Sequence, residues 1–289
     1  MTINKSLFTG VVADNIHVSA GGGGSPPRAY TSLQSLIPST VFELDATLVS
    51  SYPGTGTDWF NICDSPADGT TASAYRFVFG STSAGETNDP TFNGVADQQS
   101  AYMSFDGGDF FQRFSTTVTP FFNAITTATA NASDFWIAWC GYVPGSAQNA
   151  YIGLNNSAGN TRGFALFKLT SNVIRLLMNF GGATNQLNLT SVTASQDVLI
   201  VVTHKQVGAV TNFWRFPNTV VSICAGPAAS ANTMSNRAFQ IGAIGDGSTF
   251  LAAGSKCYAV AMGNSFLTTA EACAIYETWG TRHGRNYKT

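Results

Sequence analysis

Short apolar runs separated by turn residues fill this sequence, and their spacing limits the possible folds more than any other feature. About a dozen runs of strand length are separated by glycine-, asparagine- and serine-rich turns. One helical signal follows them, because Thr268 is placed to cap a helix over Thr269–Trp279, with Glu271 at the capping-box position. No repeat of solenoid or propeller period is present. The pattern therefore predicts an all-β sandwich with one short C-terminal helix.

The clearest strand-and-turn unit is Ala101–Phe111, which reads AYMSFDGGDFF. Polar and apolar side chains alternate over Tyr102–Asp106, the period of a strand with one buried face. Asp106-Gly107-Gly108 then ends the strand, because glycine tolerates the positive φ angles that a sharp turn needs. An aromatic run restarts directly at Phe110, so we predict that the chain reverses here.

Three stretches resemble one family. Ala101–Phe111 is similar to the Phe-Asp-Gly turn of laminin-G-like, concanavalin A-like jelly rolls. Phe42–Trp59, FELDATLVSSYPGTGTDW, looks like the opening of laminin-G-like domains in bacteriophage structural proteins, and Phe239–Trp279 looks like the family's closing pattern. The resemblance covers roughly residues 38–283. It implies a concanavalin A-like (laminin-G-like) jelly-roll β-sandwich with a role in binding or virion architecture rather than in chemistry.

The clearest boundary is Ala20–Pro27, AGGGGSPP. Four glycines oppose regular structure and two prolines impose an extended exit, so this stretch is typical of a linker. We therefore divide the chain into an N-terminal particle-anchoring arm with its linker, residues 1–27, and one jelly-roll domain, residues 28–289. An arm this short cannot bury a core, so we expect it to pair with another copy of the chain or with another virion protein. The alternative is a disordered tail.

The charge content is low. Charged residues make up 10% of the chain and the net charge is −2, whereas an ordinary soluble domain has about 25% charged residues. This favours a homo-oligomer, or a subunit with extensive protein contacts in a crowded assembly. No basic cluster is present, so nucleic-acid binding is not expected. The basic residues near the C-terminus are interpreted as a solvated tail: Arg282, His283, Arg285 and Lys288.

The N-terminus gives no targeting signal. MTINKSLFTG lacks a charged region followed by a long apolar run, and no segment has the length of a membrane span. We therefore expect a protein that is made in the host cytoplasm and becomes part of a virion. The five cysteines include no C-x-x-C pair, so neither a disulfide framework nor a zinc site is expected, and Cys140 and Cys257 are predicted to be buried thiols.

Catalytic motifs are weak. The jelly-roll glucanases use three carboxylates on one strand, but Glu43-Leu44-Asp45 has no third carboxylate, so we interpret Glu43 and Asp45 as a solvent-facing pair. The only histidines are His17, His204 and His283. No G-x-S-x-G elbow, H-E-x-x-H motif or P-loop is present. We predict that the protein is not an enzyme, and a polysaccharide-degrading enzyme is the less favoured alternative.

The sequence leaves two kinds of ligand as candidates, a calcium ion and a glycan. The resemblance implies that Ca²⁺ could bind, since laminin-G-like domains often hold one through aspartates and loop carbonyls; the candidates are Asp106, Asp109 and Asp246. For Asp106 and Asp246 the favoured alternative is an ordinary turn-forming aspartate before glycine. Host-surface glycans are the other candidate, because sugars bind where aromatic faces lie beside loop polar groups.

The predicted sugar-binding residues are Trp59, Trp214, Asn88, Asn155 and Asn156. Tyr52, Asn160 and Asn185 are further loop or turn residues of the same kinds, and the alternative for Trp59 and Tyr52 is packing beneath the first turn. The sequence thus predicts a bacteriophage virion protein of the head or tail that is anchored by its arm and displays a lectin-like domain. A purely architectural capsid or tail adaptor with no ligand is the alternative.

Overall fold

A computed structural model gives the fold. It describes residues 28–82, 84–113, 119–126, 134–145, 149–154, 163–179, 184–191, 195–205, 210–216, 222–225, 239–244 and 249–287. The arm and linker assigned to residues 1–27 therefore lie outside the described residues. Within the described ranges, no helix is both long enough and apolar enough to cross a membrane.

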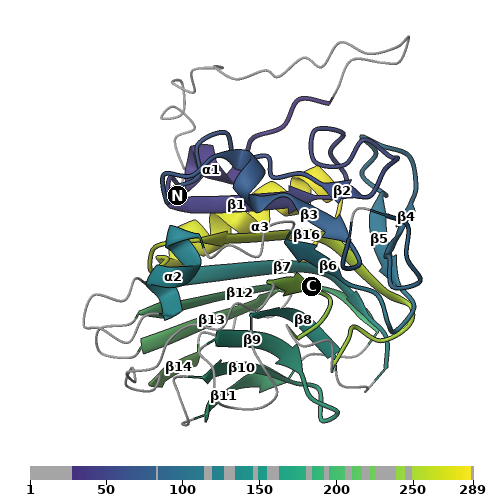
Figure 1. Ribbon diagram of the computed structural model, residues 1–289. Helices are drawn as coiled ribbons and strands as arrows, with labels where there is room; N and C mark the ends of the chain where they lie inside the picture. Colours follow the sequence, from purple (N-terminus) through teal and green to yellow (C-terminus); the bar gives the residue numbers. More distant parts are fainter. Residues whose placement is uncertain are drawn as a thin grey trace, which may run out of the picture.

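The first of two sheets, sheet A, has β16 at its centre. Its strands are β1 (Thr40–Asp45), β4 (Thr91–Asn93), β5 (Tyr102–Phe105), β7 (Phe135–Val143), β12 (Gln196–Lys205), β13 (Val210–Phe216), β14 (Ser222–Ala225) and β16 (Ser255–Gly263). Their order is β14-β13-β12-β7-β16-β5-β4, and β1 also pairs with β16. Strands β5 and β1 thus follow each other along one edge of β16, while β7 occupies the other edge (Figure 1).

The second sheet, sheet B, packs against the first. Its strands are β2 (Asp58–Trp59), β3 (Phe77–Phe79), β6 (Phe111–Arg113), β8 (Asn149–Leu154), β9 (Gly163–Lys168), β10 (Val173–Asn179), β11 (Thr184–Ser191) and β15 (Gln240–Ile241). Their order is β11-β10-β9-β8-β15-β6-β3-β2, with antiparallel pairing between neighbours. The described chain is therefore the predicted all-β sandwich of two sheets.

The outside of sheet A is covered by the C-terminal helix. The helical elements are α1 (Leu33–Leu36), the 3₁₀ turn η1 (Ala72–Tyr75), α2 (Pro120–Thr126) and α3 (Thr269–His283). The start of α3 is the one predicted: the Thr268 hydroxyl accepts a hydrogen bond from the Glu271 N–H, and the Glu271 carboxylate accepts one from the Thr268 N–H. The helix continues to His283, past the predicted end at Trp279, and stops at Gly284, which has a left-handed φ of 61°.

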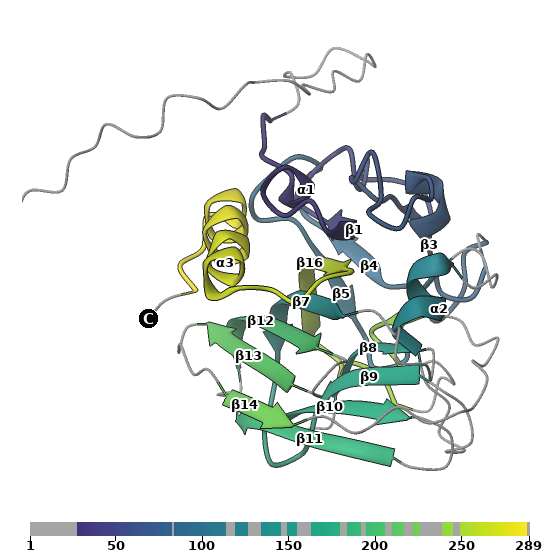
Figure 2. The same ribbon diagram turned by 90° about the vertical axis from the view of Figure 1, so that its left-hand side faces the viewer.

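Two apolar layers hold the fold together. The main core lies between the sheets and includes Trp139 and Ile152, whereas the second layer, with Trp136 and Trp279, lies between sheet A and α3. Figure 2 shows α3 on one side of β7, β12 and β16, and β8 to β10 on the other. Successive side chains of a strand point to opposite faces, so β7 is apolar almost throughout because both of its faces are covered.

The strand and turn at residues 102–109 form as predicted. In β5, Met103 and Phe105 are buried, whereas Tyr102 and Ser104 are half-buried. Gly107 has a φ of 107°, which only glycine adopts readily, and the Asp106 carboxylate accepts a hydrogen bond from the Gly108 N–H over 3.0 Å. The turn places β6 in sheet B directly after β5 in sheet A, so it joins the two layers.

Strand β11 and helix α2 are among the elements that the sequence analysis missed. Strand β11, TNQLNLTS, has only two leucines and lies at the edge of sheet B, so its polar composition hides it. Helix α2 is a short segment that fills the end of the sandwich with Phe121, Phe122 and Ile125, and it shows no helical period over so few residues.

Candidate functional site

The tryptophans predicted to hold a sugar are core residues. Trp59 has 0% and Trp214 has 1% of its surface exposed. The Trp59 ring packs on Phe111 with centroids 4.7 Å apart, and Trp214 belongs to the layer beneath α3. The prediction for these two tryptophans is therefore corrected: their large apolar rings are buried in the two cores. Tyr52 is buried as well.

The predicted asparagines are only partly described. Asn88 is half-buried, and its main-chain carbonyl accepts a hydrogen bond from the Phe110 N–H over 3.2 Å. Asn155, Asn156 and Asn160 lie outside the described residues. The backbone of Asn185 belongs to β11.

Asp106 and Asp109 stabilise the turn after β5. The Asp109 carboxylate accepts a hydrogen bond from the Asp106 N–H over 2.7 Å, while Asp106 accepts from Gly108. Burial, with a contribution from the neighbouring Asp106, raises the pKa of Asp109 to about 7. Asp246 lies outside the described residues, and the described part of the chain contains no group of three or more His, Cys, Asp or Glu side chains that could hold a metal. Calcium binding therefore stays a prediction without a site.

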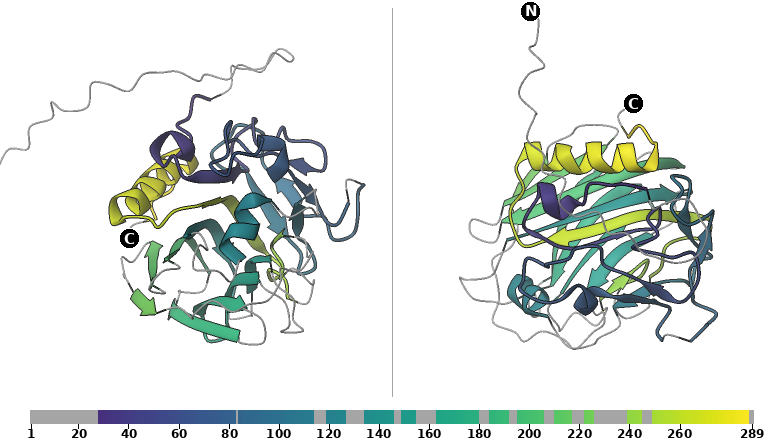
Figure 3. Two further views of the ribbon diagram at one scale, coloured as in Figure 1. Left: turned by 60° about the vertical axis from the view of Figure 1, so that its left-hand side comes forward. Right: turned by 90° about the horizontal axis from the view of Figure 1, so that it is seen from above.

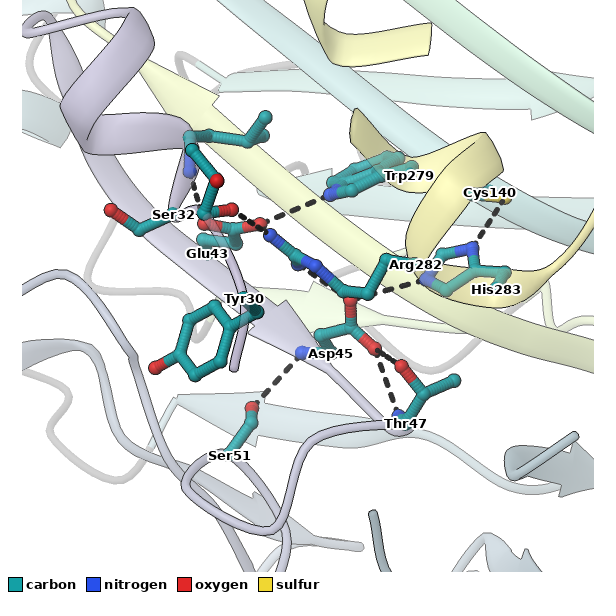
Figure 4. Close-up of polar contacts among 12 residues, drawn as sticks. Tyr30, Ser32, Glu43, Asp45, Thr47, Ser51, Cys140, Trp279, Arg282 and His283 are labelled. Atoms are coloured by element: carbon teal, nitrogen blue, oxygen red, sulfur yellow. Dashed lines mark hydrogen bonds and ion pairs between the residues drawn. The ribbon is translucent and has the colours of Figure 1, made fainter. Parts of the chain in front are cut away.

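Beneath α3 lies a charged cluster, which we define as Glu43, Asp45, Arg282 and His283. The carboxylates on β1 were predicted to face solvent, and the basic residues were predicted to form a solvated tail. The first prediction is wrong, and the second is wrong for Arg282 and His283, because all four side chains of the cluster are buried. The last turn of α3 packs over β1, so the carboxylates of β1 and the basic side chains of α3 are each other's polar partners. Figure 4 shows the resulting network.

Arg282 is the centre of the charged cluster. Its Nη1 lies 2.6 Å from Glu43 Oε1 and 2.7 Å from Asp45 Oδ2. Its Nη2 donates to the main-chain carbonyl of Thr31 over 2.6 Å, and the Tyr30 ring stacks on the guanidinium. Burial alone would lower the pKa of Arg282, but the charges of Glu43 and Asp45 outweigh it and raise that pKa. The cluster therefore joins the lead-in segment, β1 and α3.

Every carboxylate oxygen in the cluster already accepts a hydrogen bond. Glu43 Oε1 also accepts from Trp279 Nε1, and Glu43 Oε2 accepts from the Leu33 N–H. Asp45 Oδ1 accepts from the N–H and the hydroxyl of Thr47. Burial opposes ionisation of Asp45, but His283 and Arg282 outweigh burial and hold its pKa well below the ordinary range. Neither carboxylate is available to a substrate.

His283 connects the cluster to a buried thiol. Its Nε2 lies 3.1 Å from Asp45 Oδ2, and its Nδ1 lies 3.1 Å from the Tyr287 hydroxyl, which in turn lies 2.8 Å from Cys140 Sγ. An acid, an imidazole and a thiol in a row resemble a catalytic relay, but Cys140 is fully buried. Burial raises the pKa of the Cys140 thiol well above its ordinary value, which disfavours the reactive thiolate. The arrangement thus serves packing.

The open end of the same sheet face carries the candidate site. We call it the tyrosine platform and define it as Tyr102, Tyr142 and Lys256. In β7, Tyr142 follows Trp136, Ala138 and Cys140 at two-residue spacing, so it lies on the face that α3 covers farther along. Figure 3 shows α3 running beside β16 on this face.

The platform is built by the strand register. Lys256 of β16 pairs with Ser104 of β5 on one side and with Tyr142 of β7 on the other. Its Nζ lies 4.6 Å from the ring centroid of Tyr102 and 5.5 Å from that of Tyr142. All three platform side chains are half-buried, so each one also meets solvent.

Polar groups border the platform on both sides. Next to Tyr142 in the register is Asp197, whose carboxylate accepts a hydrogen bond from the Tyr258 hydroxyl over 2.6 Å and forms an ion pair with Arg285. On the opposite side, Asn93 Nδ2 donates to the Ser104 hydroxyl over 2.7 Å. Sequence reasoning missed the platform because its three residues come from distant strands. Only the alternating pattern of Tyr102 gave a signal.

Comparisons with known proteins give the fold class. No protein-family model matches the sequence, and no curated protein matches it. A structure of botulinum neurotoxin type C, which depends on interaction with two ganglioside molecules to enter cells, matches with a TM-score of 0.56 and 8% identity, over 86% of this chain and 53% of that one. The binding domain of botulinum neurotoxin serotype D/C matches with a TM-score of 0.55, 8% identity and the same coverage.

A third structure is the CBM40 of Ruminococcus gnavus IT-sialidase bound to α2,3-sialyllactose, with a TM-score of 0.47 and 8% identity, over 60% of this chain and 95% of that one. The chain spans about half the length of the botulinum neurotoxin chains that it matches. At such low identity the likeness shows a shared β-sandwich fold. The likeness does not test the resemblance to phage laminin-G-like domains, which stays a prediction.

Proposed function

We propose that this chain is a lectin-like β-sandwich domain that binds glycans through the tyrosine platform. The observation that carries the proposal is the pair of half-buried tyrosine rings, Tyr102 and Tyr142, on an open sheet face. A sugar ring offers C–H faces that pack on aromatic side chains and hydroxyls that bond to polar ones. Asp197, Ser104 and Asn93 supply polar groups at the border.

The structural comparisons support this proposal at the level of the fold. The type C neurotoxin interacts with gangliosides, and its structure contains the same kind of β-sandwich. A fold of this kind can therefore belong to a glycan-binding protein. The specific contacts proposed here rest on the platform of this chain alone.

A finer part of the proposal concerns the virion. The resemblance of Phe42–Trp59 to phage laminin-G-like openings suggests a head or tail protein that residues 1–27 attach to other virion proteins. The base of that segment is held firmly, because Arg28 Nη1 donates to the Arg282 carbonyl over 2.8 Å and Arg28 Nη2 donates to the Thr47 carbonyl over 3.2 Å. Many attached copies would turn weak glycan contacts into stable adhesion.

The proposal includes no catalytic activity. The carboxylate pair that most resembled a glycosidase motif, Glu43 and Asp45, is buried and fully hydrogen-bonded. A glycosidase needs one carboxylic acid and one carboxylate flanking an accessible bond. A purely architectural adaptor is the second candidate, favoured by the low content of charged residues.

A multivalent glycan screen tests the proposal. The protein, displayed in many copies on beads, should retain a subset of host-surface polysaccharides. Tyr102→Ala combined with Tyr142→Ala should weaken this retention at least about tenfold, because aromatic stacking is lost. The matched control is Phe60→Ala, an exposed aromatic with 38% of its surface accessible on another part of the body. Retention of no glycan at all would favour the architectural adaptor.

The virion part has a separate test. Deleting residues 1–27 should abolish incorporation of the protein into particles while the body remains folded, as circular dichroism would report. Normal incorporation of the shortened protein would contradict the anchoring role.

A further inference from the structure

We infer that the glycan bound by the tyrosine platform carries an anionic group, a carboxylate, sulfate or phosphate, which the Lys256 ammonium receives. The inference rests on the proposed function and names the class of ligand.

The first argument is that Lys256 keeps its charge unmatched. None of the ion pairs among the described residues includes Lys256. Its described partners are the faces of Tyr102 and Tyr142, which attract a cation but carry no net charge. A full positive charge is therefore presented at the open end of sheet A.

Two other cations of this sheet face, Arg282 and Arg285, are matched. Arg285 pairs with Asp197 and stacks on Tyr258, with the guanidinium carbon 4.1 Å from the ring centroid. Arg282 pairs with both carboxylates of the charged cluster. Lys256 differs from both, so the positive charge of the platform is local rather than a general property of the face.

The second argument is that the platform offers donors and few acceptors. The ammonium carries three N–H donors, and the hydroxyls of Tyr102 and Tyr142 have no hydrogen-bond partner among the described residues. Asp197, the nearest carboxylate in the strand register, is already occupied by Arg285 and the Tyr258 hydroxyl. A surface of this composition complements a ligand rich in acceptors, as carboxylates, sulfates and phosphates are.

The third argument concerns discrimination. A neutral sugar stacked over the rings would take water from the ammonium without replacing its charge partner, which is unfavourable. An anionic sugar restores that partner with a charge-assisted hydrogen bond. We expect a preference of about tenfold for the anionic over the neutral form at this partly solvated site.

Matched polysaccharide pairs test the inference. One pair is a uronic-acid polymer and its carboxyl-reduced form, a second is a sulfated polymer and its desulfated form, and a third is a phosphorylated polymer and its dephosphorylated form. The wild-type protein should retain one or more anionic members about tenfold better, with a preference that shrinks as salt rises. The pair with the largest ratio identifies the anionic group.

Two variants give the decisive comparison. Lys256→Gln should reduce binding of the anionic member to the level of the neutral one, while Lys256→Arg should keep the preference because it keeps the charge. Unchanged unfolding midpoints would show that both variants are folded. Equal retention of both members, unaffected by Lys256→Gln but lost in the double tyrosine variant, would overturn the anionic class and leave the glycan-binding function intact. Retention of no member would overturn both.

Discussion

The two ends of the outer face of sheet A both carry a cation, but in different surroundings. At one end α3 covers the sheet, and the guanidinium of Arg282 contacts two carboxylates in a fully buried network. At the other end the cover stops at Gly284, and the ammonium of Lys256 lies between two half-buried tyrosine rings with no described carboxylate partner.

This difference separates structural charge from available charge. A buried ion is stable only if it is paired and hydrogen-bonded, so loss of one member of the charged cluster should destabilise the domain strongly. A partly solvated cation has no such requirement because water can serve as its partner. Folding does not demand a charge at Lys256, which leaves the ammonium available to the ligand proposed above.

The largest effect is expected from Arg282→Met. The substitution leaves Glu43 and Asp45 buried without their cation, so we expect the free energy of unfolding to fall by about 3–5 kcal/mol. Urea unfolding followed by tryptophan fluorescence measures this, since Trp279 packs in the same layer. The control is Arg285→Met, which removes a half-exposed ion pair and should cost less than about 1 kcal/mol. Equal losses in both variants would contradict the distinction between the two ends.

The second-largest effect is expected from acid, which should lower the free energy of unfolding through the charged cluster. The pKa of Asp45 is held below its ordinary value, so its contribution is complete above the unfolded-state pKa of about 3.9 and is lost as the pH falls below that. We expect a loss of about 2 kcal/mol between pH 5 and pH 2, measured as the shift of the urea midpoint. Asp45→Asn should be less stable at pH 7 but should respond less to acid. An identical pH dependence in both proteins would assign the acid sensitivity to other carboxylates.

These two ends also show how far the sequence alone reaches. Local signals were sufficient for the β-sandwich, for the strand and turn at residues 102–109 and for the capping box at Thr268, because each depends on residues close together in the chain. The extent of α3 beyond Trp279 was missed since its last turn is polar, and it is polar because it meets the buried carboxylates of β1.

The charged cluster could not be predicted in this way. Glu43 and Arg282 are 239 residues apart, and nothing local to either one indicates burial. The tyrosine platform could not be predicted for the same reason, since Tyr102, Tyr142 and Lys256 meet only through the register of three strands. The aromatic residues that did stand out, Trp59 and Trp214, fill the cores instead, because large rings bury the most apolar area.

A smaller effect is expected at the start of α3. Thr268→Ala removes the hydroxyl that accepts from the Glu271 N–H, so the free energy of unfolding should fall by about 1 kcal/mol. Glu271→Gln is the control, because glutamine can still accept a hydrogen bond from the Thr268 N–H. Thermal unfolding followed by circular dichroism compares the two variants. A loss as large as that of Arg282→Met would mean that the cap, rather than the charged cluster, holds α3 on the sheet.

The smallest effect is expected from Lys256→Gln. The substitution removes two partly solvated cation–π contacts and leaves no buried partner, so the free energy of unfolding should change by no more than about 0.5–1 kcal/mol. The same urea series measures it beside Arg282→Met. A loss of several kcal/mol would make Lys256 a structural cation like Arg282 and remove the argument for an available charge. A near-zero change combined with loss of anionic glycan retention would instead show that one sheet face carries two charges with separate tasks: Arg282 holds the helix on the sheet, and Lys256 receives a ligand.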